Sequence, residues 1–232
     1  MKPSLGTAAA LTFLAAGGCG LISSDVFRVT FDLPTQTYTF DTAQWGNLPP
    51  AAQGATFPSV TCQTDNDCCT LGTVAGLNCT TTPLVCKSSA CAAEIPESIS
   101  TTINLAMQVG SLSKYASLGN ISISSITYTV SNNTLNVDLP PLNIYLAPMD
   151  VTDPTDPRAQ LFGTTEAIPA GTDPTAMVQR VSNASAIFQT FTANLSTPFN
   201  FIAATTVEIA AGTPVPNGQV TISVTGTISA QP

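Results

Sequence analysis

The residues that could carry chemistry in this 232-residue chain are mainly aspartates and cysteines, because the sequence contains no histidine. Without histidine, the chain lacks the commonest general base and the commonest metal ligand of proteins. Three carboxylates, those of Asp150, Asp153 and Asp156, recur at steps of three residues. Such a loop can hold Ca²⁺ through carboxylate and backbone oxygens, although Asp-Pro is also an ordinary turn-forming dipeptide. The same two interpretations, a calcium site or a plain turn, apply to Asp65 and Asp67.

One short motif suggests nucleophilic catalysis. Ser111-Leu112-Ser113-Lys114 fits the S-x-x-K pattern of serine acyl-transferring enzymes, but neither S-D-N nor K-T-G follows it. A glycosidase using carboxylates alone would need two acids about 5–10 Å apart in a cleft, a distance that sequence spacing does not give. We therefore expect no catalytic residues, with a carboxylate-based hydrolase as an alternative.

The amino terminus has the organisation of an export signal. Met1-Lys2 provides a positive charge, residues 5–16 are largely apolar, and small residues precede Cys19 in Ala16-Gly17-Gly18-Cys19. The apolar run is too short for a transmembrane helix, which needs about 20 residues, and suits a secretory signal. The final segment resembles the lipobox of bacterial lipoproteins of the Gram-negative type. That resemblance implies cleavage after residue 18, lipidation of Cys19 and a place in the outer membrane or at the cell surface; a secreted or periplasmic protein is the alternative.

Cysteine parity agrees with a lipidated Cys19. The chain has seven cysteines, and six of them lie within 30 residues. If Cys19 carries lipid, those six can pair completely as disulfides, with the two adjacent cysteines bonded to different partners. Zinc is the rival interpretation, but there is no C-x2-C pair and no histidine. The spacing resembles that of knottin and EGF-like modules. The predicted disulfide cysteines are Cys62, Cys68, Cys69, Cys79, Cys86 and Cys91.

The composition favours strands and excludes one class of partner. The chain has 6 Lys+Arg against 14 Asp+Glu, a net charge of −8, which argues against a nucleic-acid-binding surface. Only 9% of residues are charged, whereas 35 are Thr and 20 are Ser. Thr favours the pleated surface of a sheet, and the strong helix formers Lys, Glu and Arg are scarce.

Apolar residues alternate with polar ones along most of the chain, as expected for half-buried strands. A phase shift at Ser124-Ser125 predicts a β-bulge, and Asn132-Asn133 predicts a two-residue hairpin turn. The predicted inward rows are Phe27, Val29 and Phe31; Tyr38 and Phe40; Ile99, Ile103, Leu105, Met107 and Val109; Ile121 and Ile123, then Ile126, Tyr128 and Val130; Leu135, Val137 and Leu139; Leu142, Ile144 and Leu146; Phe199, Phe201, Ala203, Thr205, Val207 and Ile209; and Val220, Ile222, Val224 and Ile228.

One segment has helical spacing instead. Ala184, Ile187, Phe188, Phe191 and Leu195 recur at steps of three and four, with Ser182 or Asn183 as the cap and Thr197-Pro198 as the stop. We expect this helix to cover one end of a sandwich.

The fold class that follows is all-β: an immunoglobulin-like or related β-sandwich with one short helix and a disulfide-rich insertion. Residues 126–135 and 142–146 also resemble the strand–Asn–strand core of late-embryogenesis-abundant (water-stress) immunoglobulin-like domains, which implies a sandwich and no chemistry. The expected organisation is a signal peptide at 1–18, strands and a linker at 19–61 that join the sandwich, the insertion at 62–92, and the main domain at 93–232.

The function expected from these features is a binding or structural role for a non-catalytic, lipid-anchored envelope or cell-surface protein. Its partners would be the membrane, through the lipid, and an unknown protein or glycan. No cofactor is expected apart from Ca²⁺ in the aspartate loop. An alternative is a glycan- or calcium-dependent adhesion module with a shallow aromatic patch, for which the candidates are Trp45, Tyr38, Tyr115 and Tyr145.

Overall fold

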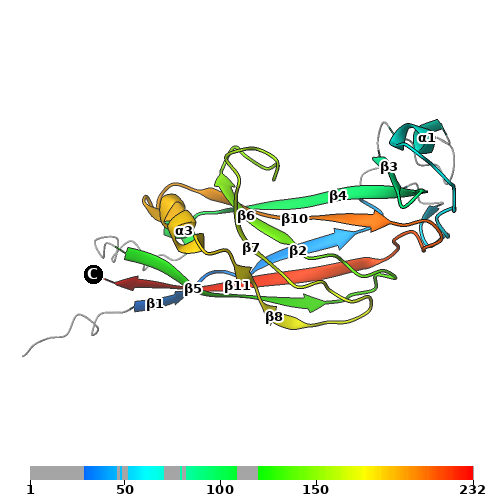
Figure 1. The fold of residues 1–232 in the computed structure, drawn as a ribbon. Helices are drawn as coiled ribbons and strands as arrows, with labels where there is room; N and C mark the ends of the chain where they lie inside the picture. Colours follow the sequence, from blue (N-terminus) through cyan, green and yellow to red (C-terminus); the bar gives the residue numbers. More distant parts are fainter. Residues whose placement is uncertain are drawn as a thin grey trace, which may run out of the picture.

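The computed structural model describes residues 29–45, 48, 52–70, 79, 82–108 and 120–231. In this part of the chain, two antiparallel sheets of five and six strands face each other as a sandwich (Figure 1). The fold is therefore the all-β sandwich that the alternating pattern predicts. The sequence reasoning identified one of the three short helices.

The five-stranded sheet is built around the last strand of the chain. Its order is β1-β11-β5-β8, and β2 also pairs with β11, so that β1 and β2 follow each other along one edge. Leu33-Pro34-Thr35 separates these two strands, and the Leu33 N–H donates to the Gly226 carbonyl at 2.7 Å. The strands are β1 (Val29–Asp32), β2 (Gln36–Asp41), β5 (Asn120–Ser131), β8 (Thr175–Met177) and β11 (Gln219–Gln231).

The six-stranded sheet has β10 near its centre. Its order is β3-β4-β10-β6-β7-β9, and β10 pairs with β4 over eleven residues and with β6 over six. The strands are β3 (Leu84–Lys87), β4 (Ala90–Ile103), β6 (Asn143–Pro148), β7 (Gln160–Thr164), β9 (Gln179–Arg180) and β10 (Phe199–Ile209).

The described part of the chain has three short helices, of which α1 and α3 lie at opposite ends of the sandwich (Figure 1). They are α1 (Asp65–Thr70), α2 (Leu105–Gln108) and α3 (Ala184–Thr192). The α3 helix contacts β5, β6 and β7 and buries Ile187 and Phe188, so it covers one end of the core as expected. Within the described ranges, none of the helices has the length and apolar character needed to cross a membrane.

The core between the sheets is filled by the inward rows of the long strands. Phe199, Ala203 and Ile209 of β10 and Val220 and Ile228 of β11 are at most 2% exposed. Tyr38 of β2 stacks on Phe201 of β10 with ring centroids 6.2 Å apart, which joins the two sheets directly. Contacts of this kind combine large apolar burial with a preferred ring geometry.

The predicted bulge is present, and the predicted hairpin after it is not. Ser125 pairs with Thr227 and Ile123 with Ile228, which leaves Ser124 as the extra residue; its hydroxyl donates to the Thr227 carbonyl at 2.8 Å. Asn132 has the expected positive φ of 52°.

The row Leu135, Val137 and Leu139 was wrongly predicted to return along β5. The two neighbours of β5 are β11 and β8. The Asn133 amide instead donates to the carbonyls of Pro169 and Thr172 and turns the chain away from β5.

Two other boundaries differ from the prediction. Leu105 and Met107 lie in α2 rather than in a continued strand, because the Asn104 side chain accepts the Met107 N–H at 3.1 Å and begins a helix. The α3 helix ends at Thr192 rather than near Thr197, since Asn194 accepts the next N–H bonds. Its N-cap residue, Asn183, makes no side-chain capping bond. Phe27 and Val109 of the predicted rows lie outside the described residues.

The six clustered cysteines form three disulfides at the end of the sandwich opposite α3 (Figure 1). The pairs are Cys62–Cys86, Cys68–Cys91 and Cys69–Cys79, so the adjacent cysteines do bond to different partners. We call this region, residues 62–91, the disulfide end. Because β4 begins here and continues into the six-stranded sheet, the disulfide end is attached directly to the sandwich.

Candidate functional site

A groove of about 770 Å³ lies on the outer face of the six-stranded sheet. Its volume falls within the range of about 300–1,000 Å³ typical of small-molecule sites. We call it the outer-sheet groove. Its lining comes from β4, β10 and β6, from the chain before β6, and from the loop between β6 and β7: Pro96, Glu97, Ser98, Pro140, Pro141, Asn143, Tyr145, Thr152, Asp153, Pro154, Thr155, Ala204, Thr205 and Thr206.

Strand register places the groove floor. Ala204 of β10 pairs with Ser98 of β4 on one side and with Asn143 of β6 on the other. On β6, the side chains of Asn143 and Tyr145 alternate with the fully buried Ile144, so they face outward. The floor is therefore a row of small and polar side chains beside one aromatic ring.

The wall formed by residues 149–159 folds over the same sheet face. Val151 packs with Ala147 and Ile202 in a small apolar cluster outside the main core, with Tyr145 at its margin. The loop is fixed by Asn200, a buried residue of β10 whose amide donates to the carbonyls of Met149 and Val151 at 3.0 and 2.8 Å. Asn200 is thus the positioning residue of this wall.

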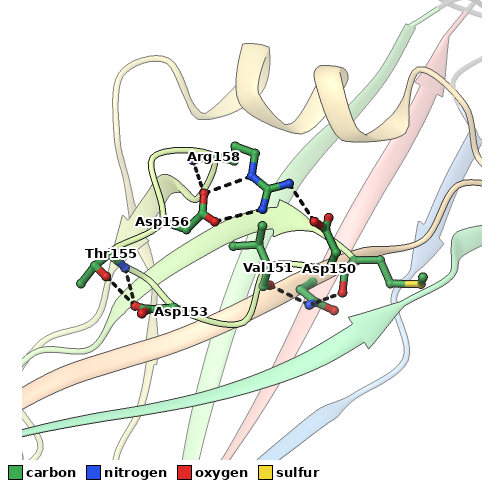
Figure 2. Close-up of polar contacts among 8 residues, drawn as sticks. Asp150, Val151, Asp153, Thr155, Asp156 and Arg158 are labelled. Atoms are coloured by element: carbon green, nitrogen blue, oxygen red, sulfur yellow. Dashed lines mark hydrogen bonds and ion pairs between the residues drawn. The ribbon is translucent and has the colours of Figure 1, made fainter.

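Ion pairs and turns inside the loop occupy the carboxylates that were considered for calcium (Figure 2). Arg158 pairs with Asp150 at 2.8 Å and with Asp156 at 3.0 Å. Asp153 accepts both the N–H and the hydroxyl of Thr155 at 2.8 Å. These contacts lower the pKa of all three aspartates, through Arg158 for Asp150 and Asp156 and through Thr155 for Asp153.

The arginine therefore provides the positive charge that a cation would otherwise bring to this loop. Among the His, Cys, Asp and Glu side chains of the described residues, the one group of three whose ligand atoms lie within 4.8 Å of one another is Cys62, Cys68 and Cys91. Those cysteines are in disulfides. Neither Arg158 nor its two partners line the groove.

Prolines make the groove walls stiff. Pro140 and Pro141 stand at one side, and the Thr205 hydroxyl donates to the Pro141 carbonyl at 3.2 Å. Pro96 and Pro154 contribute at other points of the rim. Because the proline ring fixes φ, these segments lose little conformational freedom when a ligand binds.

The charge of the groove is negative. Among the described residues that line it, Glu97 and Asp153 are carboxylates and none is Lys or Arg. The bonds from Thr155 lower the pKa of Asp153, which favours its charged form over the protonated form that a general acid of glycoside hydrolysis needs.

The second acidic pair, Asp65 and Asp67, has local structural roles. Asp67 accepts the N–H groups of Gln63 and Thr64 at 2.8 Å each, and the bond from Thr64 is one half of a capping box at the start of α1. These bonds lower the pKa of Asp67. Asp65 accepts the Cys86 N–H at 2.7 Å and links α1 to β3. The pattern Thr64-x-x-Asp67 in the sequence could have revealed this cap.

The remaining predicted residues divide into two groups. Tyr38 and Trp45 are 1% and 3% exposed, so the core position of these rings excludes them from a surface patch. Tyr145 does line the groove. Cys19, Tyr115 and the motif at 111–114 lie outside the described residues.

A second cavity lies between the sheets but is too small for an organic ligand. Its volume is about 30 Å³, and its lining includes Leu33, Ile126, Phe162 and Phe188. A cavity of this size has room for about one water, but apolar cavities of this kind stay dry. We therefore take the outer-sheet groove as the candidate site.

Comparison with known proteins gives no functional assignment. No family model matches the chain, and no curated protein matches it. The chain is similar to a solved structure of Desmodium yellow mottle tymovirus at 13% identity and a TM-score of 0.20, covering 100% of this chain and 92% of that chain. For turnip yellow mosaic virus the values are 16% identity, a TM-score of 0.21, and coverage of 60% and 92%. At these TM-scores, neither similarity bears on the fold or the function of this chain.

Proposed function

We propose that this chain is an exported, lipid-anchored envelope or cell-surface protein that binds a ligand in its outer-sheet groove without transforming it. The observation that supports a binding role is the groove itself, which has stiff walls and a polar floor on a rigid sheet. Sites built on strands hold their geometry better than sites built on loops.

Two features support export. The sequence Ala16-Gly17-Gly18-Cys19 has the small residues of a lipoprotein signal. The six other cysteines are consumed in three disulfides, as expected of a protein that folds in an oxidising compartment. Cys19 is then the single cysteine of the chain left over for lipid.

Mass spectrometry of the mature amino terminus tests the anchor. The expected result is an N-terminal peptide that starts at Cys19 and carries diacylglycerol, together with accumulation of the precursor when lipoprotein signal peptidase is inhibited. The Cys19→Ser variant should move from the membrane fraction to the soluble fraction. An unmodified Cys19 in the mature protein would contradict lipid anchoring and leave the binding role to be judged by its own assay.

The hydrolase alternative has its own test. The groove contains two carboxylates, Glu97 and Asp153, as a glycosidase would require. We expect no new reducing ends when the purified full chain is incubated with polysaccharides. Product release that is abolished in Glu97→Gln but not in a Glu166→Gln control would overturn the non-catalytic assignment, because Glu166 does not line the groove.

A further inference from the structure

We infer that the ligand of the outer-sheet groove is a neutral oligosaccharide, bound as a short extended chain across β4, β10 and β6. This inference rests on the proposed binding function and specifies its ligand class. Four properties of the groove lead to it: its charge, its polar floor, its aromatic ring and its paired backbone.

Charge excludes acidic ligands first. The lining residues that the structure describes include two carboxylates and no Lys or Arg, and the chain as a whole carries a net charge of −8. An anionic polymer such as a nucleic acid or a uronic-acid glycan would meet like charge at these carboxylates. The ligand is therefore not an acidic one.

The backbone of the floor excludes strand addition. Peptides that bind a sheet as an extra strand need an edge with unpaired N–H and C=O groups. Ala204, at the centre of the floor, is paired on both sides, with Ser98 and with Asn143. A ligand on this floor can meet side chains only.

Those side chains match the hydroxyl groups of a sugar. Ser98, Thr152 and Thr206 offer hydroxyls, and Asn143 offers an amide, each of which can donate or accept. Tyr145 adds a ring with a polar tip, which gives one apolar contact of the size of a sugar face. The described residues of the floor include no large aliphatic side chain that would form a pocket for an apolar peptide residue.

The dimensions fit an extended chain of a few sugars. A volume of about 770 Å³ on an open sheet face is larger than one monosaccharide requires. The proline walls and the Asn200-fixed loop hold this shape before the ligand arrives, which reduces the entropy lost on binding.

The test uses the purified full chain on an oligosaccharide array with neutral, acidic and amino-sugar probes, followed by calorimetry. Binding of neutral oligosaccharides, with weak binding of acidic ones, is the expected result. Binding confined to acidic or to cationic probes, or no binding to any probe, would overturn the ligand class.

Two variants, each with a matched control, locate the binding in the groove. Thr206 is exposed on the floor strand, so Thr206→Trp fills the groove from a position that tolerates a large side chain. It should weaken neutral-glycan affinity at least ten-fold, whereas the matched Thr39→Trp, on an exposed position of β2 in the other sheet, should leave affinity unchanged. Tyr145→Ala should weaken binding similarly, and Tyr145→Phe should retain it because the ring remains.

Melting temperatures of the four variants show whether each is folded. If the variants are folded and affinity is insensitive to Thr206→Trp, the groove is not the glycan site. A different result separates the two proposals. If neutral glycans do not bind, but the chain retains an envelope component that Thr206→Trp loses and Thr39→Trp keeps, the groove binds a ligand of another class. The binding function then stands and the glycan inference is wrong. If Thr206→Trp reduces neither glycan binding nor retention of an envelope component, both the binding function of the groove and the glycan inference are wrong.

Discussion

At the residue scale, one buried amide connects the core to the groove. Asn200 is 2% exposed and lies between Phe199 and Phe201 on β10. Asn200→Ala should lower the free energy of unfolding by about 2–3 kcal/mol, because the carbonyls of Met149 and Val151 lose their donor in a buried setting. Urea unfolding measures this loss, and hydrogen exchange should speed up in residues 149–159.

A matched control separates this effect from general strand damage. Thr102 is exposed and donates to the Asn200 side-chain oxygen at 2.7 Å. Thr102→Val removes that one bond and leaves both loop bonds in place, so we expect a loss of about 1 kcal/mol or less. Equal losses in the two variants would show that the loop bonds do not matter.

A second residue-scale prediction concerns alkaline stability. Burial raises the pKa of Tyr38, which an interaction with Thr101 lowers by a smaller amount. Because the folded pKa lies above the unfolded value, the folded state binds the proton more tightly. Tyr38 therefore adds no pH dependence to the free energy of unfolding below about pH 10, and above it lowers that free energy by about 1.4 kcal/mol per pH unit.

Tyr38→Phe should remove this dependence. Among the described residues, the Tyr38 hydroxyl has no hydrogen bond of regular geometry, so the variant should be close to wild type at pH 7. Urea unfolding of both proteins at pH 7, 9 and 11 makes the comparison. Parallel curves for the two proteins would show that folding does not raise the pKa of Tyr38.

At the element scale, the strands and α3 were predictable and the pieces between them were not. The row from Phe199 to Ile209 is buried along its length because sheet burial follows a period of two. By contrast, the alternation of apolar residues continues in the sequence through Leu105 and Met107, although the Asn104 cap starts a helix there. Asn200 looked like an outward residue of β10, because the loop that buries it comes from some 50 residues earlier. The groove was missed for the same reason, since it combines four separate segments of the chain. Of its lining residues, only Tyr145 and Asp153 were predicted as candidate functional residues.

The disulfide end gives the element-scale prediction. Cys68–Cys91 closes a separation of 23 residues and both cysteines are buried, whereas Cys69–Cys79 closes 10. In the chain-entropy description, longer loops are stabilised more. Replacing Cys68 and Cys91 together by Ala should cost about 3–4 kcal/mol of unfolding free energy, against about 2–3 for Cys69 and Cys79.

Urea unfolding of the two double variants, with mass spectrometry to verify the remaining pairs, measures this order. The buried pair joins α1 to β4, so its loss should also increase hydrogen exchange in both elements. A larger loss of unfolding free energy in the variant without Cys69–Cys79 than in the variant without Cys68–Cys91 would contradict this prediction.

At the scale of the whole molecule, a lipid on Cys19 would fix which end faces the membrane. Described structure begins at Val29, and nine residues separate it from Cys19, a reach of at most about 35 Å. Val29 pairs with Ala230 at the end that carries α3, and the disulfide end lies opposite (Figure 1). β4 alone spans about 45 Å along the axis that joins these two ends. The disulfide end should therefore project away from the bilayer. The groove should then lie along the side of the sandwich, open to ligands in solution.

Energy transfer to a membrane dye tests this orientation. A fluorophore can be placed through a non-natural amino acid, without a new thiol, at Ser196 beside α3 or at Ser89 in the disulfide end; both positions are exposed. In vesicles we expect strong transfer from Ser196 and weak transfer from Ser89, because the two positions differ by most of the sandwich length in distance from the bilayer. The Cys19→Ser protein with the same labels should show no transfer from either. Equal transfer from both labels in the lipidated protein would contradict this orientation. It would mean that the long axis of the sandwich lies parallel to the membrane surface, so that the groove is no longer held away from the lipid.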